Sequence, residues 1–279
     1  MDDLWVVLPH IGAGGAQKVG LLAAEHFAVQ GFKVRVLSLR HGHPIKHAIP
    51  DGVELLDLGP DVEGGGNRSL IARLRRFTNA QLIKLCRLLT LAGLQLTWRW
   101  CEHKVQPDAD AWVTRLLAWC MEGLGGLRYR RLRVLLQQQR PKRVLALLTK
   151  TNILCAAAVW DLPIHLVVSE RNDPRLQQLD RLWSRLRSVY YRRADVVTAN
   201  TEGVLDALQA MGPWKRLALL PNPLPGGLRL QDSHQPSHDQ REILAVARLV
   251  PQKGLDVLIR AFASLPPSVR DGWRLTIVG

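Results

Sequence analysis

Two basic side chains five residues apart give the strongest chemical signal in this sequence of 279 residues. Arg248 and Lys253 follow an apolar run at 243–247, and Gly254 precedes a stretch with helical periodicity. Cations beside the free N–H groups of a helix N-terminus are typical of a clamp for phosphate or diphosphate. Two solvated surface charges are the alternative explanation. The pair predicts a binding site for a diphosphate-bearing ligand.

A glycine-rich corner near the N-terminus could bind an anion in the same way. Gly14 and Gly15 separate an apolar run at 4–8 from a helical pattern at 16–30. Glycine lets a backbone approach a ligand closely, although it also forms ordinary tight turns. A dinucleotide-binding fingerprint would have a third glycine where Gln17 stands, and an acidic residue near the end of the second strand. The corner therefore favours an anion site and disfavours NAD.

Polar residues follow three further apolar runs. Ligands of an open parallel α/β sheet bind outside the carboxyl ends of its strands, so residues just beyond these runs are candidates for a cleft that receives an acceptor. For the asparagines, loop or cap hydrogen bonding is the alternative role. Asp173 before Pro174 is predicted to cap a helix. The cleft candidates are Asn152, Glu170, Arg171, Asn172 and Asn200.

The elements that would position these residues alternate between strand and helix patterns. This alternation predicts an α/β fold with a parallel, doubly wound sheet over residues 1–220, and 221–240 has the composition of a linker. Residues 241–279 read as strand, loop, helix and strand, which is a single βαβ unit. Such a unit needs further strands and helices, so we expect an incomplete second domain. The expected strands of the first domain are 4–8, 34–39, 53–58, 144–148, 164–168 and 196–199.

Positive charge is concentrated in one segment. The chain has a net charge of +14, and residues 68–143 hold 16 Lys and Arg against 4 Asp and Glu, a net of +12. Within 68–140 we expect basic helices, with Lys84, Arg87 and Arg99 on one face and leucines opposite. Such helices suit an anionic bilayer surface, and an ordinary surface helix is the alternative. Nucleic-acid binding has only the charge in its favour, because no recognised motif accompanies it.

Other classes of protein are disfavoured by composition. Four cysteines without metal-ligand spacing indicate free thiols in a reducing compartment. No secretory signal and no apolar run of about 20 residues is apparent, so we expect neither export nor a membrane span. We also expect no metal site.

The sequence from Ala247 to Phe262, closing with 275–279, resembles the entry into the second domain of family-4 retaining glycosyltransferases. The corner at 14–16 resembles their first glycine-rich loop, and the run at 169–174 resembles a subgroup that acts on lipid-linked or surface polysaccharide acceptors. Residues 221–223 resemble their interdomain hinge. The resemblance covers about 4–58 and 143–279.

The resemblance implies a GT-B architecture: a complete Rossmann-like N-terminal domain with a basic helical insertion at 68–140, and the first βαβ unit of a second such domain. Arg248 and Lys253, with Gly14 and Gly15, would bind the nucleotide-sugar, a UDP-sugar by expectation. Neither a metal nor another cofactor is implied. The leaving phosphate would help to deprotonate the acceptor hydroxyl with retention of configuration. No catalytic residue is assigned.

The sequence departs from the family pattern in two respects. Gln17 stands where a glutamate is common, and the family's glutamate-bearing donor motif should lie beyond Gly279. We therefore expect a cytoplasmic enzyme on the inner membrane face, of which these residues alone are an inactive fragment. The alternatives are a non-catalytic protein of the membrane surface and a basic nucleic-acid-binding protein.

Overall fold

The computed structural model describes residues 2–40, 42–58, 111–224 and 241–279, together with Thr78, Gln81, Leu85, Leu88, Leu89 and Ala92. The chain divides into two compact units, Met1–Pro225 and Gly226–Gly279. Each unit is treated by itself below.

The first unit is built on a seven-stranded sheet in the order β3-β2-β1-β4-β5-β6-β7, with every neighbouring pair parallel. This order confirms the predicted doubly wound α/β sheet. Six strands match the predicted ones to within two residues. The seventh has three partly exposed residues, which give too weak an apolar signal to be predicted. The strands are β1 (Leu4–Leu8), β2 (Val34–Ser38), β3 (Val53–Asp57), β4 (Arg143–Leu147), β5 (His165–Glu170), β6 (Val196–Ala199) and β7 (Leu217–Leu219).

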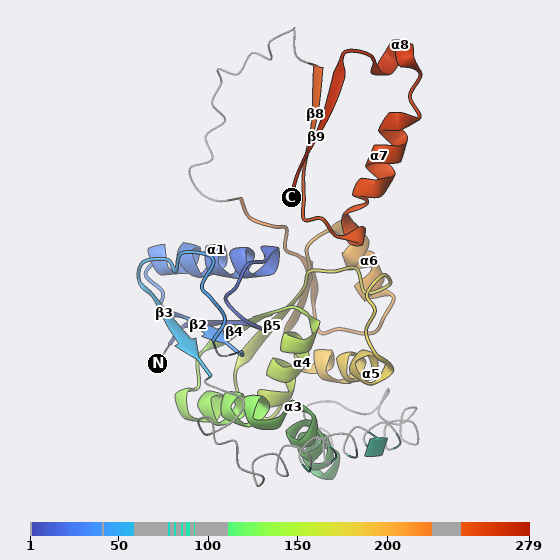
Figure 1. Cartoon of the computed structure of the whole chain (residues 1–279). Coiled ribbons are helices and arrows are strands. Elements are labelled where there is room, and N and C mark those ends of the chain that lie inside the picture. Colours follow the sequence, from blue (N-terminus) through green and yellow to red (C-terminus); the bar gives the residue numbers. More distant parts are fainter. Residues whose placement is uncertain are drawn as a thin grey trace. The chain divides into compact units, whose positions relative to one another are not determined.

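Helices cover both faces of this sheet (Figure 1), with α1 on one face and α3, α4 and α5 on the other. Alternate side chains of β1 divide between two apolar cores, because successive strand residues point to opposite faces. Val6 and Leu8 pack in the core with α1, whereas Trp5 and Val7 pack in the larger core on the other side. The helical elements are α1 (Gly15–Val29), α3 (Ala111–Gln139), α4 (Thr149–Ala158), α5 (Arg181–Tyr190), η1 (Tyr191–Arg193) and α6 (Glu202–Gln209).

The last part of the basic segment belongs to the core of the first unit. Tyr129, Leu132 and Leu136 of α3 are fully buried at helical spacing, and the Arg133 guanidinium donates two bonds of 2.9 Å to the Asp161 carboxylate. This stretch is thus the crossover helix between β3 and β4. The predicted basic face, with Lys84, lies outside the described residues.

The prediction that Asp173 caps a helix is wrong. Its carboxylate accepts the backbone N–H of Arg175 at 2.9 Å, and its carbonyl accepts that of Leu176 at 3.1 Å, which closes a turn. The next helix, α5, begins only at Arg181, and Asp180 is its N-cap. An Asp-Pro pair suits a turn as well as a helix start, so the local pattern does not distinguish between these two structures.

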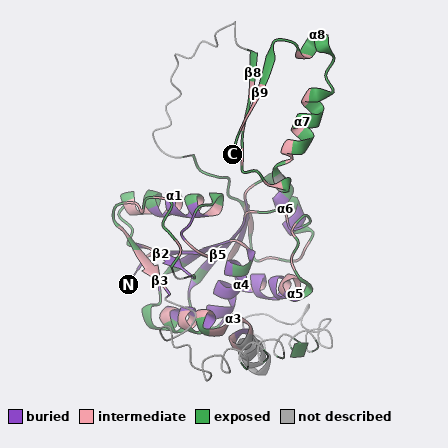
Figure 2. Ribbon diagram, viewed as in Figure 1, coloured by how far each residue is buried: buried purple, intermediate pink, exposed green. Residues whose placement is uncertain are grey.

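The second unit is one parallel βαβ arrangement, as predicted. Its elements are β8 (Arg241–Val246), η2 (Pro251–Lys253), α7 (Leu255–Ala263), α8 (Pro267–Arg270) and β9 (Trp273–Val278). In Figure 2 the buried residues gather in the sheet and in α4 and α5 of the first unit, whereas none of the described side chains of the second unit is buried. Leu244 and Val246 leave 61% and 71% of their surface exposed. Residues 241–279 thus form the backbone of a βαβ unit without burying any described side chain among themselves.

Within the described part of the chain, no helix is both long and apolar enough to cross a membrane.

Candidate functional site

The strand order of the first unit reverses between β1 and β4, and ligands of such sheets bind in the crevice outside the strand ends at this point. The glycine-rich corner follows β1, and α4 begins directly after β4. Leu148, between β4 and α4, has a φ of 75° and a ψ of 140°, a backbone conformation that favours glycine. Such strain costs about 1–3 kcal/mol and is concentrated at functional sites. The predicted glycine corner therefore adjoins the expected ligand crevice.

A histidine organises the glycine corner. The Nδ1 atom of His10 lies 3.1 Å from the Gly12 N–H, which donates to it, and the buried Gln17 amide contacts the other ring nitrogen at 3.3 Å. The His10 ring stacks on that of His43 at 4.5 Å between centroids. Burial, followed by the charges of His43 and Arg40, lowers the pKa of His10. A neutral imidazole thus fixes the loop, a role that the sequence pattern did not predict.

The two glycines of the predicted anion site differ in their surroundings. A Cβ atom on Gly14 would lie 2.1 Å from Gln17 Oε1, whereas one on Gly15 would meet nothing within 4 Å. No side chain caps α1 at Gly14, so its first backbone N–H groups remain available to an anion.

Gly14→Ala and Gly15→Ala should therefore change stability in opposite directions. Alanine at 14 must displace the buried Gln17 side chain from His10, which is expected to cost about 1–3 kcal/mol. Alanine at 15, on the first turn of α1, is expected to stabilise by about 0.5–1 kcal/mol. Urea denaturation of the two variants measures the difference. Equal unfolding free energies would show that Gln17 does not constrain the corner.

Glu170 lies inside the first unit, at the end of β5, with no exposed surface. Its carboxylate accepts hydrogen bonds from Thr149 Oγ1 at 2.9 Å and from the Tyr191 hydroxyl, and it lies 4.0 Å from the buried Arg187 guanidinium. Burial raises the pKa of Glu170, although these three partners oppose the rise. Burial and the same carboxylate raise the pKa of Tyr191. Glu170 therefore supports the strand end from within rather than facing an acceptor.

Two of the three candidate asparagines, Asn152 and Asn200, differ in position. Asn152 lies within α4, fully buried, and donates to Ser169 O at 3.0 Å and to the Tyr191 hydroxyl at 2.9 Å. It thus joins the same polar cluster as Glu170. Asn200 follows β6 as predicted, and its Oδ1 atom, like that of Asn152, is buried with no hydrogen-bond partner among the described residues. An unsatisfied acceptor costs about 1–3 kcal/mol, so it is a candidate contact for a ligand or water.

Arg171 and Asn172 follow β5 as predicted, and Asn172 is exposed. The Arg171 guanidinium donates to Ser169 Oγ at 3.3 Å, to Leu220 O at 3.2 Å and to Asn222 Oδ1. Burial lowers the pKa of Arg171. Among the described residues no carboxylate forms an ion pair with it, so its charge is uncompensated.

The predicted diphosphate clamp lies in the second unit, in the turn between β8 and α7. The turn is closed by bonds from Val250 N to Arg248 O at 2.8 Å and from Lys253 N to Val250 O at 3.0 Å. Gly254 adopts a left-handed conformation with φ of 62°, and no side chain caps α7. Arg248 and Lys253 are exposed, and in the described residues neither side chain is paired with a carboxylate. The turn thus presents two available cations beside a free helix N-terminus.

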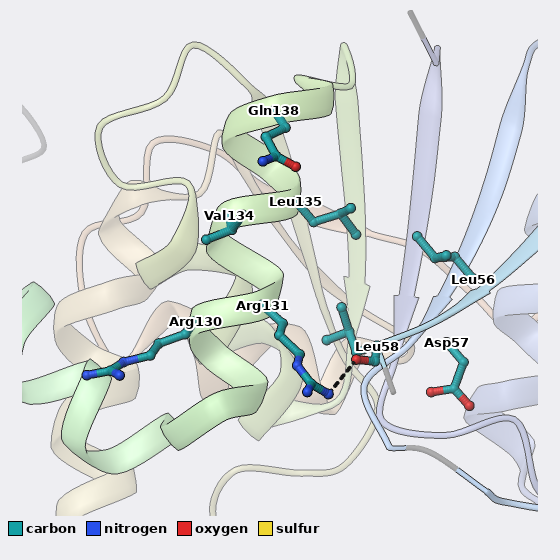
Figure 3. Close-up of a pocket in the computed structure, with 8 residues that line it drawn as sticks. All are labelled: Leu56, Asp57, Leu58, Arg130, Arg131, Val134, Leu135 and Gln138. Atoms are coloured by element: carbon teal, nitrogen blue, oxygen red, sulfur yellow. Dashed lines mark hydrogen bonds between the residues drawn. The ribbon is translucent and has the colours of Figure 1, made fainter. Parts of the chain in front are cut away.

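A groove of about 340 Å³ lies between the end of β3 and α3 (Figure 3). Leu56, Leu58 and Val134 contribute apolar surface, and Arg130 and Arg131 add positive charge. Arg131 donates to Leu58 O at 3.1 Å. Sequence reasoning missed this groove because its two walls lie more than 70 residues apart in the chain.

No group of three His, Cys, Asp or Glu side chains suited to a metal occurs among the residues that the structure describes.

Comparison with solved structures finds two-domain glycosyltransferases. The chain aligns with Anabaena Alr3699/HepE in complex with UDP and glucose at 16% identity and a TM-score of 0.55, covering 99% of this chain and 61% of that one. It aligns with WaaG, a glycosyltransferase involved in lipopolysaccharide biosynthesis, at 14% identity and a TM-score of 0.55, covering 98% and 62%. WaaB, a lipopolysaccharide outer core galactosyltransferase, gives 11% identity, a TM-score of 0.51, and coverage of 99% and 60%. The chain spans about three fifths of these proteins and shares the GT-B fold.

Family models give the more specific result. A model described as glycosyl transferase 4-like domain matches residues 87–223, and one described as glycosyl transferases group 1 matches 229–279. No curated protein matches the chain. The two models meet near the boundary between the two compact units, and together they match well over half of the chain. Both models describe glycosyltransferases, so the two matched segments resemble successive domains of such an enzyme.

Proposed function

We propose that the chain comprises the acceptor-side domain and the first part of the donor-side domain of a retaining enzyme. This enzyme transfers a hexose from a nucleotide-sugar, specifically a UDP-sugar, to a lipid-linked or polysaccharide acceptor. The observation that carries the proposal is the turn between β8 and α7, where Arg248 and Lys253 lie exposed beside the N-terminus of α7 and where no described carboxylate pairs with either of them. Cations and free N–H groups are the partners that a diphosphate requires.

In this mechanism Arg248 and Lys253 stabilise the charge that develops on the leaving diphosphate. The nearby carboxylate of Asp256 would oppose an anion, but it is paired with Arg260 at 2.6 Å. The two cations take the place of a metal, and no cofactor is required. The leaving phosphate itself helps to deprotonate the acceptor hydroxyl on the face of the sugar from which it departs.

The strand ends of the first unit supply the acceptor side of the proposed site. Gly14 and Gly15 offer backbone N–H groups, and Arg171 and Asn172 offer side-chain donors at the end of β5. Glu170 and its buried partners hold this edge in place. HepE was solved with UDP and with UDP-glucose, and WaaB is a galactosyltransferase of the lipopolysaccharide outer core. These relatives support a nucleotide-sugar donor and a saccharide acceptor here.

A cytoplasmic position on the inner membrane face completes the proposal. The groove in Figure 3 combines apolar walls with two arginines, which suits a lipid that carries phosphate. Leu85, Leu88 and Leu89, on helical backbone, each leave at least half of their surface exposed. Leucines that face outward within a basic segment are typical of interfacial helices.

Binding to anionic vesicles should depend on the groove. Arg130→Gln combined with Val134→Asn removes one cation and one apolar wall, and we expect vesicle affinity to fall at least fivefold, since each arginine near an anionic surface contributes about 1 kcal/mol. Sedimentation with vesicles containing phosphatidylglycerol measures the affinity. Arg140→Gln is the matched control at the exposed end of α3, and it should bind nearly as the unchanged chain does. An equal loss in the control would indicate diffuse charge attraction instead.

A donor screen tests the enzymatic proposal. Saturation-transfer NMR on the chain with UDP-, GDP- and ADP-sugars should give signals for a UDP-sugar. Binding is the appropriate readout because the second unit buries none of its described side chains, and we expect little transfer from these 279 residues alone. If no nucleotide-sugar binds while anionic vesicles do, a non-catalytic protein of the membrane surface becomes the better account. Salt-dependent binding to RNA but not to vesicles would instead favour the nucleic-acid alternative.

A further inference from the structure

The segment through which the chain leaves the first unit has little apolar support. It follows β7, a three-residue strand that pairs with β6 at the sheet edge. Leu220 is 40% exposed, and residues 221–224 are all exposed. One backbone bond, from Leu220 N to Ala199 O at 2.7 Å, extends the pairing beyond β7. Apolar burial therefore does not fix the direction of this exit segment, defined here as 220–222.

One side chain supplies most of the remaining polar contacts of the exit segment. The Arg171 guanidinium donates to Leu220 O at 3.2 Å and, through its other terminal nitrogen, to Asn222 Oδ1. It also donates to Ser169 Oγ within its own strand, at 3.3 Å. A planar guanidinium can hold two acceptors in a fixed relation, which a lysine ammonium cannot do. Arg171 thus ties the end of β5 to both ends of the exit segment.

The residue before Arg171 is anchored in the interior. Glu170 has no exposed surface, and its carboxylate accepts bonds from Thr149 at the start of α4 and from Tyr191 in η1. These partners fix the last residue of β5 relative to two helices. Because Arg171 is the next residue, the anchored Glu170 limits the movement of the Arg171 backbone.

We propose that Arg171 is a positioning residue that sets the path of the exit segment, with Glu170 as its buried anchor. The inference rests on the proposed function, in which the segment leads to the donor-side domain and its path governs how the donor meets the acceptor. It assigns Arg171 a role separate from acceptor binding. The contacts that carry it lie entirely within the first unit.

Hydrogen–deuterium exchange of the full chain tests this role without any need for activity. Arg171→Ala should speed exchange of the amides of Leu219 and Leu220 in the 219–222 stretch at least tenfold, because opening of the segment no longer breaks side-chain bonds. Arg171→Lys should restore part of the protection. Asn222→Asp, which adds a charge partner, should slow exchange in the presence of Arg171 and have no such effect beside alanine at 171. An effect of Asn222→Asp that occurs only in the presence of Arg171 requires a direct coupling between residues 171 and 222.

Arg175→Ala is the matched control, since Arg175 also lies after β5 and bonds to Asp173 and to Gly203 O. It should leave exchange at 219–222 unchanged. Unchanged exchange in Arg171→Ala, or a response to Asn222→Asp that does not depend on Arg171, would overturn the inference. Titration with UDP separates the two proposals: a protected exit segment without nucleotide binding would refute the proposed function and leave the role of Arg171 intact.

Discussion

Replacing Arg248 or Lys253 with alanine should weaken UDP binding to the chain by about 10- to 100-fold each, and more when both are replaced. A hydrogen bond from a charged donor contributes about 1.5–3 kcal/mol, which corresponds to this range of affinity. Neither side chain is engaged by a carboxylate among the described residues, so the energy is available to a ligand. Isothermal titration with UDP measures the loss.

Arg260→Ala is the control for the clamp. Arg260 lies one turn after Asp256 in α7, and its guanidinium already donates to the Asp256 carboxylate at 2.6 Å. Its removal should weaken UDP binding modestly, because it frees the Asp256 charge, and by clearly less than the loss of Arg248. A ranking in which Arg260→Ala has the larger effect would exclude the turn after β8 as the diphosphate site.

Replacing Glu170 with alanine should lower the free energy of unfolding by about 3–5 kcal/mol, the usual result of removing one partner of a buried charge pair. Alanine leaves the Tyr191 hydroxyl without its acceptor and Arg187 without its nearby carboxylate. Thr149 Oγ1 loses one of two acceptors and keeps Gln177 Oε1 at 3.2 Å. Glu170→Gln keeps an acceptor oxygen in place and should cost much less. Urea denaturation at neutral pH measures both.

The pH dependence of the same variants gives a second test. Burial raises the pKa of Glu170 above 4.5 in the folded chain, so the folded state binds more protons than the unfolded state above that pH. Stability contributed by this group therefore falls as pH rises from 4.5 through the folded pKa. The stability of Glu170→Gln should lack this dependence on pH, because glutamine does not titrate. Glu25→Ala, on the exposed face of α1, should change stability by no more than about 0.5 kcal/mol and keep the wild-type pH profile. A profile unaltered in Glu170→Gln would contradict this account.

Much of the fold follows from local sequence. Apolar runs such as 4–8 and 164–168 predict strands, because a strand covered on both faces needs apolar residues at nearly every position. The turn that carries the proposed clamp could also be predicted, since Arg248, Lys253 and Gly254 are close in sequence. Strand β7 was missed because three partly exposed residues form a strand there only through pairing with β6.

The positions of the predicted cleft residues depend on tertiary contacts, which cannot be predicted from neighbouring sequence. Glu170 was predicted to line a cleft after a strand, yet it is buried and bonded to Thr149 and Tyr191, each 21 residues away in the sequence. His10 belongs to no recognised motif. It holds the glycine corner by accepting the Gly12 N–H and by stacking on His43, which follows the next strand. A run of polar residues shows where a strand ends, but tertiary partners determine which of them face a ligand.

The most direct test of the central claim is a map of where UDP binds. Backbone amide shifts of the isotope-labelled chain, followed during titration with UDP, UMP and inorganic phosphate, locate the site and its chemistry together. The account predicts that UDP perturbs the amides at 247–257 and binds at least tenfold more tightly than UMP, because the second phosphate engages Arg248 and Lys253. Equal affinity for UDP and UMP, or shifts confined to the basic residues of α3, would contradict the assignment of a nucleotide-sugar site to the turn between β8 and α7.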